Sequence, residues 1–176
     1  MIDKLNAYSI DFKGLGLGEH TFEFVLDEAF FAEYPEGEIT QGNLKAQVLL
    51  RKQNNLMEIE CGIEGTVQVV CDRCLEQFAL PIAYSGQLFV RTGTPQADAD
   101  TDVIYIGEHD YRLHLAQYLY ESVVLSLPIQ RYHGQNGTNP NDCDADMLGR
   151  MNQDGQQQGE PEIDDPRWAK LKELIE

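Results

Sequence analysis

The sequence predicts an α+β protein built on a mainly antiparallel, strongly bent or barrel-like β-sheet, with one main covering helix and a short C-terminal helix. Strand-like alternation dominates the first 106 residues, which contain no long helical pattern, and a parallel sheet would need helical crossovers there. The longer helical patterns lie at residues 111–126 and 164–176, so the long helices follow the strands instead of alternating with them. Residues 1–130 are therefore expected to form one β-rich domain.

The first two predicted strands form a hairpin. Residues 5–12 and 21–26 both alternate in polarity, and the glycine-rich run 14–18 between them is typical of a turn. One or two helical turns are expected over residues 27–33. Residues 44–50 then place apolar side chains at every second position, which predicts a third strand.

The clearest periodicity lies between residues 57 and 71. Apolar side chains occupy the odd positions and mostly polar ones the even positions, which predicts a long strand with one wet face. Cys61 falls on the apolar face and is expected to be a small core residue. Gly62 and Gly65 indicate a bulge or a bend. Residues 77–91 alternate again and predict a further strand.

The second half of the chain contains the main helix. A short buried-type strand is expected at residues 103–106, and a helix over residues 111–126, capped by Asp110 and ended by Pro128. Composition then changes. Residues 131–163 are polar, acidic and poor in apolar side chains, so they are predicted to be a loop or linker. A metal ion bound there would attach this segment to the sheet.

Residues 164–176 predict a C-terminal amphipathic helix. Asp165 suits the capping position and Pro166 the first helical position, while Trp168 and Leu171 recur on one face. A helix of about eleven residues is too short to be stable alone in water. The apolar stripe is therefore expected to dock on the body of the chain or on a partner, and both alternatives stay open.

Net charge is the strongest global feature. The chain carries 13 Lys and Arg against 30 Asp and Glu, a formal net charge of −17. Such a surface repels nucleic-acid phosphates and attracts basic partners. Residues 92–165 hold 14 acidic side chains against three arginines, which favours an acidic interaction surface or a solvated tail. Solubility alone is the simpler interpretation.

Two functional classes are not expected from the sequence. No apolar run of 18 residues occurs, which predicts no transmembrane helix, and the first six residues lack the pattern of a signal peptide. A nucleophile elbow, a Walker lysine and an H-E-x-x-H motif are all missing. The expectation is a cytoplasmic protein without enzymatic activity.

The cysteines indicate a candidate metal centre. Cys71 and Cys74 form a C-x-x-C pair in a predicted turn between antiparallel strands, which is typical of half a zinc site. His133 and Cys143 are the candidates for the other half, with Asp142, Asp144 and His114 as weaker options. A redox pair, with Arg73 lowering a thiolate pKa, is one alternative. In the other alternative these residues are core and turn residues that hold no metal.

Three short blocks carry a family resemblance. Residues 71–75 read C-D-R-C-L and fit a C-x-R-C-L motif. Residues 125–143 contain a Leu-Pro pair followed by a histidine and a cysteine, and residues 165–171 fit D-P-R-x-x-x-L. In this order the blocks resemble the YceD family of large ribosomal RNA subunit accumulation proteins, and the likeness covers the chain from about residue 40 to its end.

The resemblance implies a role in making or stabilising 23S ribosomal RNA and a functional link to the small basic ribosomal protein L32. It brings no catalytic residue. Many members carry further cysteines after the Leu-Pro pair, which look metal-binding, so one zinc ion is the candidate cofactor.

Charge and resemblance together predict a non-enzymatic ribosome biogenesis factor that contacts a basic ribosomal protein or a pre-ribosomal particle. Direct nucleic-acid binding is expected to be weak or absent, and no membrane is involved. The alternative is a zinc-stapled cytosolic interaction module with an unrelated partner. The residues expected to contact the partner are Arg73, Asp165, Pro166, Arg167, Trp168 and Leu171.

Overall fold

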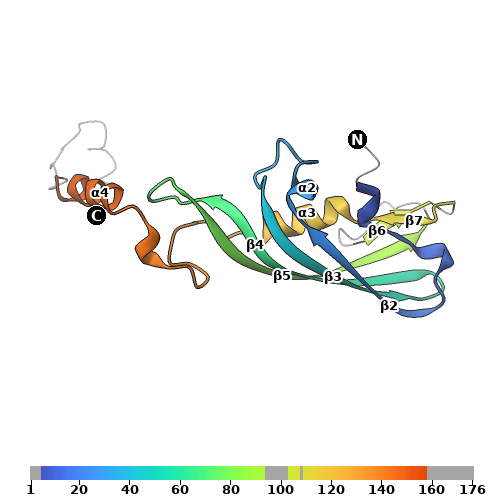
Figure 1. Cartoon of the computed structure of the whole chain (residues 1–176). Helices are drawn as coiled ribbons and strands as arrows, with labels where there is room; N and C mark the ends of the chain where they lie inside the picture. The colour runs from blue at the N-terminus through green and yellow to red at the C-terminus, as the bar shows by residue number, and fades with distance from the viewer. Residues whose placement is uncertain (1–4, 94–102, 108, 158–176) are drawn as a thin grey trace, which may run out of the picture.

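The structure is a computed structural model that describes residues 5–93, 103–107 and 109–157 (Figure 1). Its strands are β1 (Ser9–Asp11), β2 (Gly18–Leu26), β3 (Gly42–Lys52), β4 (Leu56–Val70), β5 (Gln77–Thr92), β6 (Val103–Ile106) and β7 (Arg112–His114). Its helices are the short 3-10 turns η1 (Asn6–Tyr8), η2 (Phe12–Gly14) and η3 (Pro140–Asp142), and the α-helices α2 (Glu28–Phe31), α3 (Ala116–Leu125) and α4 (Ala145–Gln157).

Five strands form the main sheet in the order β2-β3-β4-β5-β6, and β1 pairs with β7 in a separate small sheet. All neighbours pair antiparallel except β5 and β6, which run parallel. The α+β class is therefore confirmed, while the main sheet is mixed and open. It does not close into the barrel that was one of the sequence expectations, because its edge strands β2 and β6 do not pair with each other.

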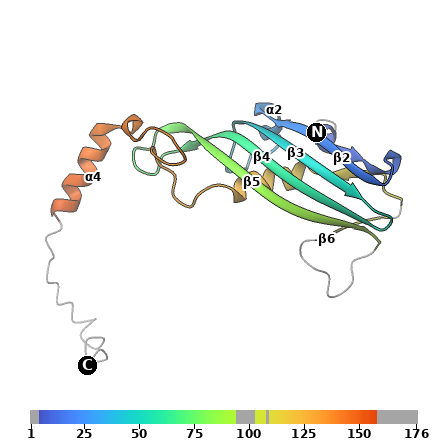
Figure 2. The same cartoon turned by 90° about the horizontal axis from the view of Figure 1, so that it is seen from below.

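The core lies between the curved sheet and the helices on one of its faces (Figures 1 and 2). Odd-numbered residues of β4 point inward, and Ile59 and Ile63 are fully buried. α2 adds Phe30 and Phe31 to this core. Asp27 caps α2 by accepting hydrogen bonds from the backbone N–H groups of Ala29 and Phe30. The strands predicted over residues 44–50, 57–71 and 77–91 are confirmed.

Two predictions about the strands are wrong. The opening hairpin does not form, because β1 pairs with β7 far along the chain and β2 pairs with β3. The bulge that was one of the two expectations for Gly62 and Gly65 does not occur, since the register of β4 against both neighbours is continuous. The other expectation, a bend, is not excluded by this register. Gly65 instead permits a close approach of β4 to β3, with a φ of +151° that side chains other than glycine rarely adopt.

The main helix is shorter than predicted. α3 covers only Ala116–Leu125, because residues 112–114 form β7 instead. An ion pair between Arg112 and Asp11 joins β7 to β1, and this tertiary pairing outweighs the local helical pattern. Asp110 does not cap α3. Its carboxylate accepts a hydrogen bond from the backbone N–H of Gly107.

The segment predicted to be a loop, residues 131–163, contains η3 and the helix α4 (Ala145–Gln157). Asp144 provides the capping carboxylate, which accepts hydrogen bonds from the backbone N–H groups of Asp146 and Met147. Figure 1 shows α4 beyond the turn that joins β4 to β5. The predicted helix 164–176 lies outside the described residues. None of the helices that the structure describes is long and apolar enough to cross a membrane.

Candidate metal centre

The turn between β4 and β5 positions the first two candidate ligands. Cys71 follows the last residue of β4 and continues its inward-facing alternation, so its side chain is fully buried. The turn is tight, because Leu75 donates a backbone hydrogen bond to the carbonyl of Cys71, and Cys71 donates one to the carbonyl of Glu76. This closure brings Cys74 beneath the turn, where it is also buried.

Asp72 holds the second half of the candidate site against this turn. Its backbone N–H donates to the carbonyl of Arg131 over 2.7 Å, and its carboxylate accepts from the backbone N–H of Arg131 over 2.6 Å. His133 follows two residues later, and its ring lies on that of Phe78, with centroids 4.4 Å apart. These contacts fix the distant segment beside the β4–β5 turn.

Cys143 lies between η3 and α4, where local polar contacts order the chain. Asn139 caps η3 by accepting a hydrogen bond from the backbone N–H of Asn141, and its amide donates to the carboxylate of Asp142. Asp144 then caps the next helix. The cysteine is thus placed by two successive capping motifs, one on each side.

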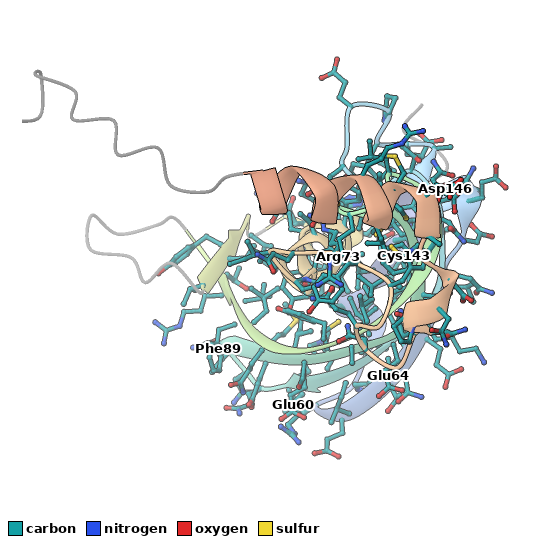
Figure 3. The ribbon with its side chains drawn as sticks, turned by 90° about the vertical axis from the view of Figure 1, so that its left-hand side faces the viewer. Glu60, Glu64, Arg73, Phe89, Cys143 and Asp146 are labelled. Atoms are coloured by element: carbon teal, nitrogen blue, oxygen red, sulfur yellow. The ribbon has the colours of Figure 1, made fainter. Side chains whose placement is uncertain are left out.

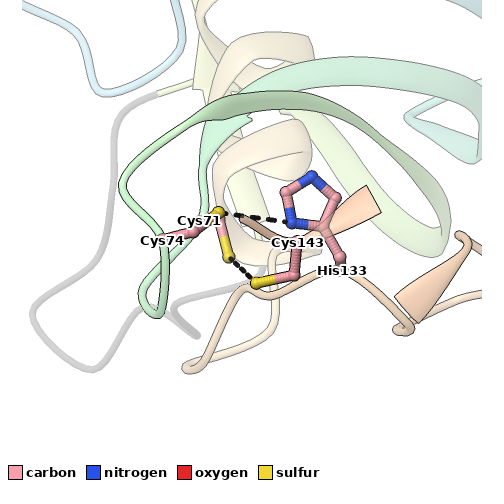
Figure 4. A group of neighbouring side chains, drawn as sticks. All are labelled: Cys71, Cys74, His133 and Cys143. Carbon is pink, nitrogen blue, oxygen red and sulfur yellow. Dashed lines mark hydrogen bonds between the residues drawn. The ribbon is translucent and has the colours of Figure 1, made fainter. Parts of the chain in front are cut away.

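All four predicted ligands converge (Figure 4). The Sγ atoms of Cys71 and Cys143 are 4.0 Å apart, and Sγ of Cys74 is 3.6 Å from Nδ1 of His133. The four ligand atoms lie within 4.8 Å of one another, and all four residues are buried. Among the described residues, no other group of His, Cys, Asp and Glu meets the same criterion. The group is close enough to hold one metal ion.

The burial pattern shows how much of the local order depends on these residues. Between residues 131 and 151, whose side chains are all described, only His133 and Cys143 are buried. Tyr132, Met147 and Leu148 are partly buried against the core. A segment with so little apolar burial has a weak core of its own, so a link through the two ligands would supply much of its order.

The surroundings also favour a thiolate at one ligand. Burial by itself raises the pKa of Cys71. Hydrogen bonds from the backbone N–H groups of Cys74, Arg73 and His133 and from the Cys74 thiol outweigh burial and lower that pKa to about 6. Burial raises the pKa of Cys143 to about 12, with the neighbouring cysteines adding to the effect. A bound cation requires deprotonated cysteine ligands, so it would displace the proton that burial favours on Cys143.

Arg73 is the one predicted partner-binding residue that the described part of the chain contains. It is exposed, and its guanidinium lies 3.9 Å from the centre of the Tyr132 ring. Arg131 pairs with Glu38 over 2.5 Å. The remaining predicted contacts, Asp165, Pro166, Arg167, Trp168 and Leu171, lie outside the described residues.

The outer face of the sheet carries a shallow hollow of about 650 Å³, with Gly62 and Ser85 among its lining residues. Glu60 also lines it, and Figure 3 shows Glu60 and Glu64 projecting from this face. Arg51 forms ion pairs with both Glu60 and Glu19, so it neutralises part of the acidic charge here. The hollow is thus a polar surface with partly paired charges.

The sequence indicated the four residues that converge, but not the residues that place them. Asp72 and Phe78 hold the distant segment through contacts across more than fifty residues, and no local pattern marks such pairs. In the sequence, Leu75 stands out only as the last residue of the C-x-R-C-L motif. Its φ of +65°, unusual for leucine, is visible only in the folded turn.

Comparison with known proteins agrees with the motifs. The comparisons with curated proteins and with solved structures give no match. The family model described as large ribosomal RNA subunit accumulation protein YceD matches residues 59–175, which include all four candidate ligands. This match spans about two thirds of the chain and confirms the resemblance drawn from its three motif blocks. The chain belongs to the YceD family.

Proposed function

We propose that this protein is a non-enzymatic ribosome biogenesis factor that supports the synthesis, processing or accumulation of 23S ribosomal RNA in the cytoplasm. The family match over residues 59–175 is the observation that carries the proposal. The same match covers the candidate metal centre and the C-terminal block, so we expect both to take part in the proposed role.

The net charge of the chain favours binding to a basic protein over direct binding to RNA. A formal net charge of −17 opposes approach to phosphates and favours approach to a basic surface. Ribosomal proteins of the large subunit are basic before they join the RNA, and L32 is the partner that we favour. The acidic protein would hold or deliver such a partner during assembly.

We further propose that the candidate metal centre holds one zinc ion. Three thiolates and an imidazole are donors that zinc prefers in structural sites. Tetrahedral zinc with its usual bond lengths separates two sulfurs by about 3.8 Å and a sulfur from a nitrogen by about 3.5 Å. The 4.0 Å and 3.6 Å separations of the two closest pairs fit these values. The ion would cross-link the segment after α3 to the β4–β5 turn.

Deletion of the gene in growing cells, followed by complementation with the wild-type chain, tests the proposed function. Cells that lack the protein should show a lower ratio of 23S to 16S ribosomal RNA, and the wild-type chain should restore it. Affinity capture at low and high salt should recover L32 or large-subunit precursors at low salt and lose them at high salt, because exposed charges are screened. Unchanged rRNA ratios in the deletion strain would refute the proposal.

Direct RNA binding is the control for the charge argument. Purified protein mixed with protein-free 23S rRNA fragments at physiological salt should show little binding. Tight binding there, with no recovery of a basic protein from cells, would refute the proposed mode of action while leaving the role in rRNA accumulation in place.

A zinc-stapled interaction module with an unrelated partner is the second candidate function. The convergence of four buried ligands supports it independently of any ribosomal role. It predicts one bound zinc, together with normal 23S levels in the deletion strain. The rRNA measurement above therefore separates the two candidates.

A further inference from the structure

Leu75, at the tip of the turn that carries Cys71 and Cys74, combines two features that disfavour leucine. Its φ is +65°, a left-handed conformation that glycine and asparagine adopt more readily than leucine does. The residue is 67% exposed to solvent. Within the described structure, neither backbone geometry nor burial gives a reason for leucine at this position. Such a residue at a strained position is a candidate for a functional contact.

A second exposed apolar residue lies on the segment that is held beside this turn. Ile129 is fully exposed, and it precedes by two residues Arg131, which pairs with Asp72 of the turn. Chain geometry and this pairing limit the distance between the Cα atoms of Leu75 and Ile129 to about 25 Å. An interface of standard size buries about 800 Å² on each partner, and a patch of that area spans such a distance. Both side chains can therefore belong to one interface.

The charges around these two residues indicate the chemistry of the partner. Residues 71–77 and 127–151 contain five acidic residues against three arginines. The local excess is thus two negative charges. Arg73 lies over the Tyr132 ring and Arg131 pairs with Glu38, while the carboxylates of Asp72, Asp142 and Asp144 accept hydrogen bonds from N–H groups. An apolar tip with an acidic surround complements an apolar pocket bordered by Lys and Arg.

We propose that the β4–β5 turn is a docking tip, in which Leu75 inserts into an apolar pocket on a basic protein and Ile129 widens the contact. The metal centre positions both segments of this tip. The identification of the basic protein as ribosomal rests on the proposed function, whereas the docking tip itself rests on the conformation, exposure and charges of the residues around it.

Leu75→Asn is the informative variant, because asparagine accepts the left-handed conformation and removes the apolar side chain. The matched control is Leu17→Asn. Leu17 is 66% exposed and precedes β2, at the far end of the strands. Since β4 spans 15 residues, the two ends lie about 50 Å apart at roughly 3.3 Å per residue. The probe is a preparation of purified large-subunit precursor particles.

We expect Leu75→Asn to weaken association with these particles at least 10-fold, while its melting temperature equals or exceeds that of the wild type. Leu17→Asn should bind like the wild type, and Ile129→Ser should bind more weakly. Wild-type affinity of Leu75→Asn would overturn the proposal. A melting temperature several degrees below wild type would also overturn it, because Leu75 would then be a structural residue.

Crosslinking in cells separates failure of the docking tip from failure of the ribosomal role. A photoreactive amino acid placed at position 75 in the full-length protein should crosslink to one basic protein. If that protein is not ribosomal, the docking tip stands and the proposed ribosomal partner is wrong, whereas the rRNA ratio of the deletion strain tests the proposed function by itself. Crosslinks to RNA, to a second copy of this chain, or to residues 164–176 of the same chain would overturn the docking tip, as would the lack of any crosslink.

Discussion

At the residue scale, the four candidate ligands show how chemistry in this chain depends on contacts between distant positions. Cys71 and Cys74 are close in sequence, and their spacing alone predicts half a metal site. His133 and Cys143 join them only because Asp72 and Phe78 hold the later segment in place. The four ligand identities could be predicted from residue type. Their convergence to within 4.8 Å could not, because it depends on tertiary contacts.

Replacement of one ligand tests the candidate site directly. Cys71→Ser should lower zinc affinity on the order of 100-fold, since one of four ligands is lost, and the purified variant should contain less than one zinc per chain. Metal analysis combined with thiol counting provides the measurement. Cys61→Ser is the matched control, because Cys61 is buried in the core away from the ligand group, and it should retain full zinc content. Equal zinc content in both variants would contradict the assignment.

The buried thiol of Cys61 predicts a pH dependence of stability. Burial raises the pKa of Cys61 from 9.0 to about 11, so the folded state favours the protonated thiol. Keeping this thiol protonated stabilises the folded state fully below pH 9. As the pH rises towards 11 this stabilisation is lost, and by pH 11 the free energy of unfolding has fallen by about 2 kcal/mol. Urea unfolding from pH 7 to 11 should show this loss in the wild type. Cys61→Ala should lack that component, and an identical pH profile for the two proteins would contradict the interpretation.

At the element scale, the long strands are the part of the fold that local sequence predicts best. β4 extends from Leu56 to Val70 with alternate residues buried, as its polarity pattern requires. The short elements were predicted poorly. Asp11 and Arg112 join β1 to β7 across a hundred residues. Because of that pairing, the residues around 112 form a strand although their local pattern predicts a helix. Three-residue strands carry too little local signal to be recognised from sequence.

Two glycines on β4 give a matched pair of variants. A Cβ atom on Gly65 would lie 2.3 Å from the carbonyl oxygen of Asn43, and its φ of +151° is strained for other residues. Gly65→Ala should therefore destabilise the protein by about 3 kcal/mol or more. A Cβ atom on Gly62 meets nothing within 4 Å, so Gly62→Ala should be neutral or stabilising by up to about 1 kcal/mol. Chemical denaturation provides the measurement, and similar stabilities for the two variants would contradict the role of Gly65.

At the scale of the whole molecule, the structure divides into a sheet with a large apolar core and a segment whose only buried side chains, from residue 131 to 151, are two candidate ligands. The first part is stabilised by hydrophobic burial. The second is held by the Asp72–Arg131 pair and by the caps of η3 and α4, and in our proposal also by a zinc ion. Removal of metal should thus affect the two parts differently.

Chelation provides the corresponding prediction. Treatment of the intact protein with a zinc chelator should speed amide hydrogen exchange in residues 131–151 at least 10-fold, because the cross-link to the β4–β5 turn is lost. Protection in β3 and in the middle of β4 should stay within a factor of about two, since their core is formed by apolar side chains. Added zinc should restore the slow exchange. Uniform acceleration across the sheet would mean that the metal stabilises the whole fold.

The sequence by itself determined the α+β class, the long strands, the acidic character and the identity of the candidate ligand residues. Alternating polarity, charge and side-chain chemistry are local properties, and each can be read along the chain. The tertiary structure alone decided that the sheet is open, that β5 and β6 run parallel and that α3 is shorter than its pattern predicts. It also decided that Cys71 and Cys143, 72 residues apart, place their sulfurs within 4.0 Å. These features depend on pairings between distant segments, whose free energy no local pattern contains.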